Sequence, residues 1–134
     1  MFEDKTIALS ISVDSDAGTI HFTEAKTSHD SEYGSITFKY SLNSSKEVSP
    51  GPLSGKDKNG KNLLHLCFET TSTKINKDAN GNPVSYEYLN NEIGVYGKLS
   101  DNLDFSTVTL TYSFKNSNPT TVKINIPELQ NVLN

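Results

Sequence analysis

His65 and Cys67 come closest to a catalytic pair in this sequence. They lie two residues apart in a predicted strand over 63–70, so their side chains share one face, and a thiol beside an imidazole is a minimal nucleophile and base. No third group is evident that would orient the imidazole, and a cysteine within a strand typically packs as a small hydrophobe. We therefore predict no catalytic residue and expect that the protein is not an enzyme.

Two oxygen-rich segments, 57–60 and 78–82, have the composition of calcium-binding loops. An EF-hand loop needs a later glycine and a distant bidentate glutamate, and both segments depart from that pattern. The three histidines also lack metal-ligand spacing. We predict no metal and no cofactor. Instead, Asn59-Gly60 and Asn80-Gly81 are expected in the positive-φ positions of hairpin turns, since Asn and Gly tolerate that conformation.

A group of tyrosine and asparagine residues between 86 and 96 is the best candidate for recognition. A tyrosine ring buries apolar area while its hydroxyl stays hydrogen-bonded, which suits contact with a protein or a sugar. Tyr88 is in phase with Val84 and is therefore also a candidate for the core. Tyr96 is out of phase with its apolar neighbours, which favours exposure. The predicted partner-binding residues are Tyr88, Asn90, Asn91 and Tyr96.

The amino-acid composition argues against some classes of binding partner. The formal net charge is -4, the sequence contains no Trp, and every basic residue is Lys. Without the Arg side chains that grip phosphates and guanine edges, nucleic acid is not an expected partner. No apolar run has transmembrane length, and the first residues lack the pattern of a signal peptide. We expect no membrane span, and a cytoplasmic protein or one exported without a cleaved signal peptide.

Alternation of apolar and polar residues identifies the elements that must position these groups. The segments 7–13 and 108–114 each place an apolar residue at every second position, which is typical of strands with one buried face. The same pattern predicts about eight strands, over 6–13, 19–23, 35–42, 63–70, 84–89, 93–99, 105–115 and 121–126. At most a short helical turn is expected after Pro127.

The predicted fold is therefore all-β: a single domain over 1–134, built as an antiparallel β-sandwich or a flattened barrel. Its predicted core consists of apolar residues at alternating positions in five of the strands: Ile7, Leu9, Ile11, Ile36, Phe38, Leu64, Leu66, Phe68, Val108, Leu110, Ile124 and Ile126.

The layout of residues 63–115 is similar to the C-terminal half of type VI secretion tube subunits: a strand, an Asn-Gly hairpin, a long strand, a turn, and Val108-Thr-Leu110-Thr-Tyr112-Ser-Phe114. The resemblance implies a subunit that assembles into stacked rings. The central helix of that family has no counterpart in this sequence.

Taken with the missing catalytic motifs, these features favour a non-catalytic module that works by protein contact or self-association. A carbohydrate-binding sandwich is the first alternative, and a subunit of a secreted or tube-like assembly is the second.

Overall fold

The computed structural model is an antiparallel all-β structure, which confirms the predicted fold class. It describes residues 3–69, 72–115 and 117–129, without the side chains at 50, 52 and 66–69. Short 3-10 turns occupy Leu99–Asp101 and Pro127–Leu129. The strands are β1 (Thr6–Ser15), β2 (Gly18–His29), β3 (Tyr33–Ser44), β4 (Pro50–Lys56), β5 (Asn62–Glu69), β6 (Ser72–Lys77), β7 (Pro83–Lys98), β8 (Thr107–Phe114) and β9 (Thr120–Asn125).

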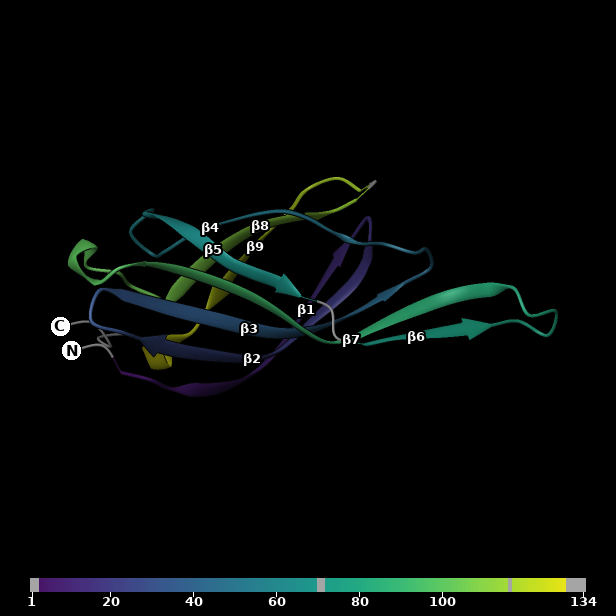
Figure 1. Cartoon of the computed structure of the whole chain (residues 1–134), viewed down its shortest axis with the longest axis horizontal. Helices are drawn as coiled ribbons and strands as arrows, with labels where there is room; N and C mark the ends of the chain where they lie inside the picture. The colour runs from purple at the N-terminus through teal and green to yellow at the C-terminus, as the bar shows by residue number, and fades with distance from the viewer. Residues whose placement is uncertain (1–2, 70–71, 116, 130–134) are drawn as a thin grey trace.

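The strands form one sheet that curls until it is nearly a barrel (Figure 1). The sheet order is β1-β2-β3-β7-β5-β4-β8-β9, and β6 pairs with β7 beyond the end of β5. The two outermost strands meet at both of their ends. Asn118 Nδ2 donates to Asp16 Oδ2 at 2.6 Å, and Lys5 Nζ donates to the Glu128 carbonyl at 3.5 Å. Between those contacts the described residues show no ladder from β1 to β9, so a seam remains.

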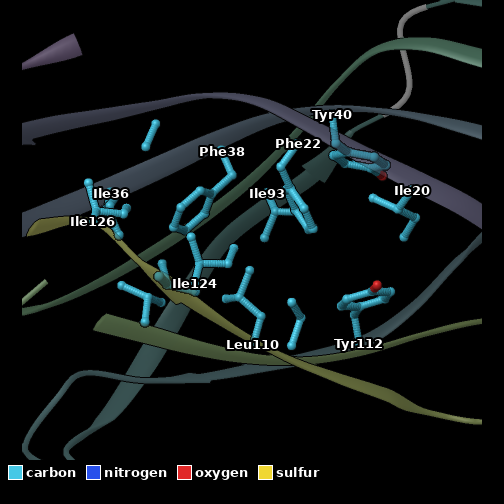
Figure 2. Packing of buried hydrophobic residues seen from close by; sticks show 14 of the residues in the cluster. Ile20, Phe22, Ile36, Phe38, Tyr40, Ile93, Leu110, Tyr112, Ile124 and Ile126 are labelled. Carbon is cyan, nitrogen blue, oxygen red and sulfur yellow. The ribbon is translucent and has the colours of Figure 1, made fainter. Parts of the chain in front are cut away.

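The inner face of the curled sheet forms a continuous apolar core (Figure 2). β8 shows the expected alternation without interruption, with Val108, Leu110, Tyr112 and Phe114 buried. Apolar side chains from β2, β3, β7 and β9 pack against them, as the period-2 pattern predicts.

Two strands are longer than predicted because each contains a β-bulge. β2 continues past Thr23, which is an extra residue between the pairs Phe22↔Tyr40 and Glu24↔Lys39. β7 runs without a break across the predicted gap between 89 and 93, with Leu89 and Asn90 both opposite Ser41. A bulge moves the following side chains to the other face of the sheet. The alternation is thereby interrupted, and one strand resembles two.

Two strands were not predicted, and both lie where the sequence alternates poorly. β4 lies in the segment predicted as a long loop, and it pairs with β8 and with the first residues of β5. β6 pairs with β7 and is mostly exposed, which removes the apolar alternation that would have revealed it.

The core also differs from the prediction at specific positions. Leu64 is 57% exposed, because its neighbour Leu63 is the one that faces inward, and alternation cannot choose between adjacent leucines. Leu9 and Ile11 are only partly buried, since β1 borders the seam. The side chains of Leu66 and Phe68 lie outside the described residues. The remaining predicted core residues are buried: Ile7, Ile36, Phe38, Val108, Leu110, Ile124 and Ile126.

The two Asn-Gly turns share one geometry. It confirms the predicted positive φ for the glycines and contradicts that prediction for the asparagines. Gly60 and Gly81 each have φ of 81°, but Asn59 and Asn80 are not in the positive-φ region. The glycine amide donates to the carbonyl of the preceding aspartate in both turns, Asp57 at 3.1 Å and Asp78 at 3.0 Å. This is the pattern of a three-residue connection with a left-handed glycine, in which only the glycine needs positive φ.

We expect Leu110→Ala to lower the free energy of unfolding by about 2–5 kcal/mol, because the side chain is fully buried and its loss leaves a cavity. Leu64→Ala is the matched control, and it should cost about 0.5 kcal/mol because that side chain is largely exposed. Urea unfolding followed by circular dichroism measures both. Equal costs would contradict this assignment of the two leucines to opposite faces.

A second pair of variants compares the two turns. Asp57 is buried, and its carboxylate accepts from the amides of Asn59 and Lys61 at 2.9 Å and of Asp104 at 3.0 Å. Asp57→Ala should therefore cost about 1–3 kcal/mol, since buried donors lose their acceptor. Asp78→Ala should cost no more than about 1 kcal/mol, because water can solvate its exposed turn. Denaturant unfolding of both proteins tests the difference.

Candidate functional site

The structure separates the four predicted partner-binding residues into two pairs. Tyr88 and Asn91 point into the protein, whereas Asn90 and Tyr96 lie on the outer face of the sheet. The bulge at Leu89 and Asn90 produces this division, because it changes which face the following residues occupy.

Tyr88 and Asn91 have structural positions. The Tyr88 hydroxyl accepts a hydrogen bond from the Val48 amide at 2.9 Å, which ties the connection between β3 and β4 to the core. Asn91 is fully buried, and its Nδ2 donates to the Tyr88 carbonyl at 2.8 Å across the bulge. Tyr88 and Asn91 are predicted from the sequence to bind a partner, but both side chains are buried and do not lie on the open surface.

Asn90 and Tyr96 mark the two ends of a concave strip along β2, β3 and β7. Asn90, in the left-handed conformation with φ of 56°, lines a hollow of about 550 Å³ over the bulges. Tyr96 is half-buried and lines a hollow of about 380 Å³ at the other end, where its ring meets Tyr33 edge-on at 5.4 Å between centroids. A third hollow of about 330 Å³ lies between them. The sequence offered Tyr96 as a signal for this strip, but its other residues come from strands far apart in the chain.

A second surface feature is the ribbon formed by β6 and the first half of β7, here called the arm (72–77 and 83–89). It projects from the barrel at the end opposite the N-terminus and C-terminus (Figure 1). One face carries Ile75, which is 48% exposed, and Val84, which is 50% exposed. Sequence reasoning missed this face. The Asn80-Gly81 turn was the available signal, since a hairpin turn before one strand requires a partner strand on its other side.

The opposite face of the arm is polar and internally bonded. Asn76 Nδ2 donates to Ser85 Oγ and to Glu87 Oε2, both at 3.0 Å. Lys74 Nζ lies 3.8 Å from Glu87 Oε2. The two faces of one ribbon therefore differ sharply in polarity.

Large pKa shifts occur in the core rather than at an open site. Burial raises the pKa of Tyr112 to about 12, and burial, with a smaller effect of Tyr112, raises the pKa of Tyr40 further. The two hydroxyls lie at the same end of the core (Figure 2). Both phenols are neutral at ordinary pH, and the raised pKa values extend that neutral range to higher pH.

Of the possible catalytic pair, His65 is exposed, and the Cys67 side chain lies outside the described residues. Among the residues that the structure describes, no three His, Cys, Asp or Glu side chains group as metal ligands would. Asp57 and Asp78 instead direct carboxylate oxygens at backbone amides of their own turns.

Comparison with protein-family models, curated proteins and solved structures gives no match to this chain. In the described part of the chain, no helix has the length and apolar character needed to cross a membrane.

The buried phenol generates a prediction about alkaline stability. Because the pKa of Tyr112 is raised in the folded state above its ordinary value near 10, the stability that this phenol contributes should be constant below about pH 10 and be lost between about pH 10 and 12. Tyr112→Phe should make that decline shallower. At pH 7 it should cost no more than about 1 kcal/mol, since the hydroxyl has no hydrogen-bond partner among the described residues. Thermal unfolding from pH 7 to 11 measures both effects.

Proposed function

We propose that the protein is a non-catalytic module that self-assembles through protein contact, with the arm of one copy binding the β1 edge of another. The observation that carries this proposal is the arm, a projecting ribbon with one exposed apolar face and one internally bonded polar face. Association would cover the apolar face and leave the polar face in water.

The apolar face gives the contact its free energy. Ile75 stands directly opposite Tyr86 in the β6–β7 ladder, and Val84 precedes Tyr86 by two residues, so the three share one face. The Tyr86 ring in turn stacks on Tyr88 at 6.4 Å between centroids, which anchors the arm to the core. Burying a half-exposed Val or Ile contributes about 1 kcal/mol or more.

The unpaired strand edges indicate which strands would meet in the contact. Among the described strands, β6 pairs only with β7, and β1 and β9 end the sheet, so three edges have room for another strand. β6 carries Lys74 and Lys77, and β9 carries Lys123, so a β6–β9 contact would bring like charges together. The exposed side chains of β1 are small or hydroxylated except for Asp14. The negative charge of Asp14 complements the positive charges of Lys74 and Lys77 on the arm.

A contact between two different surfaces of the same chain is heterologous. Such contacts produce a closed ring when the rotation closes and an open filament when it does not. This agrees with the self-assembly that the resemblance of residues 63–115 to type VI secretion tube subunits implies. No chemical step is needed for this role.

The test is self-association measured by sedimentation velocity over a range of protein concentrations. The wild-type chain should form multimers. Val84→Lys should weaken association roughly tenfold or more, because it replaces an apolar contact of about 1.4 kcal/mol with a charge. Ser85→Lys is the matched control, since it places the same charge next in sequence on the opposite face of the arm.

Charge exchange tests the choice of the β1 edge. Asp14→Lys alone should weaken association, because it repels Lys74 and Lys77, and adding Lys77→Glu should restore part of the loss. A wild-type chain that stays monomeric at all concentrations would refute the proposal. Equal effects of Val84→Lys and Ser85→Lys would exclude the apolar face as the contact.

A further inference from the structure

We propose that the concave strip along β2, β3 and β7 binds a neutral oligosaccharide. The site meets the arm at Leu89 but includes neither Ile75 nor Val84 among its lining residues, so this inference does not depend on the self-assembly proposed above.

The strip is one continuous depression. The hollow near Asn90 shares Lys39 and Glu92 with the middle hollow, and the middle hollow shares Ser28 and Ser35 with the hollow near Tyr96. From Ser41 to Tyr33 it follows β3 for roughly 26 Å at about 3.3 Å per residue. This length suits an extended chain of several sugars rather than a single compact molecule.

Strand register places the lining groups in rows across the sheet. Glu24 pairs with Lys39, which pairs with Glu92 on its other side. The next outward row along β3 contains Thr37 between Lys26 and Gly94. Lys39, Thr37 and Ser35 follow one another on this face of β3, and all three line the middle hollow.

The charges of the middle hollow favour a neutral ligand. Its middle hollow carries two carboxylates, Glu24 and Glu92, and two ammonium groups, Lys26 and Lys39, which cancel in sum. Lys39 Nζ lies 3.4 Å from Glu24 Oε2, so an incoming anion would have to compete with an existing ion pair. Sugar hydroxyls both donate and accept hydrogen bonds, and they can therefore bind carboxylate, ammonium and Ser or Thr hydroxyl groups in turn.

The Tyr96 end provides a rigid aromatic platform. The edge-on packing of Tyr33 and Tyr96 fixes both rings, which lie in a partly solvated hollow. Asp30 fixes the turn that leads into Tyr33, since its Oδ1 accepts from the amides of Tyr33 at 2.7 Å and Glu32 at 2.8 Å. Both hydrogen bonds hold the pKa of Asp30 below its usual value, and the bond from the Tyr33 amide has the larger effect. A ring held in this way can pack against the apolar face of a sugar without ordering cost.

A peptide is a poorer occupant of the strip. Peptides that add to sheets do so at an open edge, where they gain main-chain hydrogen bonds. In the strip, β2 and β3 are paired on both sides, and β7 is paired with β3 and β5. Recognition there depends on side chains alone, and most of these are hydroxylated or charged.

The experiment is a glycan array followed by calorimetric titration. The array carries neutral cello-, xylo-, manno- and malto-oligosaccharides, together with sialylated and sulfated chains. The proposal predicts binding to at least one neutral series with a dissociation constant of about 1 mM or tighter. No neutral binding at that level would overturn it, as would a preference for the acidic chains or for peptides.

Variants locate the site on the strip. Thr37→Tyr fills the middle hollow with a residue that strands favour, so it should abolish binding without unfolding the protein. Tyr96→Ala should weaken binding roughly tenfold through loss of the platform, whereas Tyr96→Phe should retain most of the affinity. If the sugar still binds to Thr37→Tyr with wild-type affinity, the strip is not its site.

The Val84→Lys variant distinguishes a failure of this inference from a failure of the proposed function. That variant disrupts the arm and should bind the neutral oligosaccharide with unchanged affinity, because Val84 lies outside all three hollows. Conversely, Thr37→Tyr should leave sedimentation unchanged. Loss of both properties in either variant would contradict the assignment of two separate sites.

Discussion

The architecture depends on two β-bulges that lie on either side of Tyr40 and Ser41 in β3. One is Thr23 in β2, and the other is formed by Leu89 and Asn90 in β7. Each changes which face of the sheet the following residues occupy, and bulges also bend and twist the strands that contain them. Figure 1 shows the result: β7 contributes to the barrel with one half and to the arm with the other.

The same bulges separate the two proposed binding surfaces. Before its bulge, β7 pairs with β6 in the arm, where Ile75 and Val84 are exposed. After the bulge, β7 lies between β3 and β5 and supplies Glu92 and Tyr96 to the outer strip. One strand therefore serves an apolar surface suited to protein and a polar surface suited to sugar, and the bulge keeps the two apart.

The two aspartate-asparagine-glycine turns show how similar local sequences acquire different roles. Asp57 and Asp78 each accept two amides of their own turn, as the sequence pattern leads one to expect. Only Asp57 is also buried and bonded to the amide of Asp104, which joins two connections that lie 47 residues apart in the sequence. The Asp78 turn remains exposed at the tip of the arm. Local chemistry forms both turns, and packing makes one of them important for stability.

The sequence by itself determined the all-β class, the buried alternation of β8 and β9, and the glycines that require positive φ, because each depends on contacts between near neighbours. It also identified Tyr96 and Asn90 as surface residues. Only the tertiary structure decided that β2 and β7 are continuous, that Leu64 faces outward and that Asn91 faces inward. A bulge is defined by the register of a strand with its partner, and that register depends on residues distant in sequence. For the same reason, neither the strip nor the arm could be assembled from alternation alone.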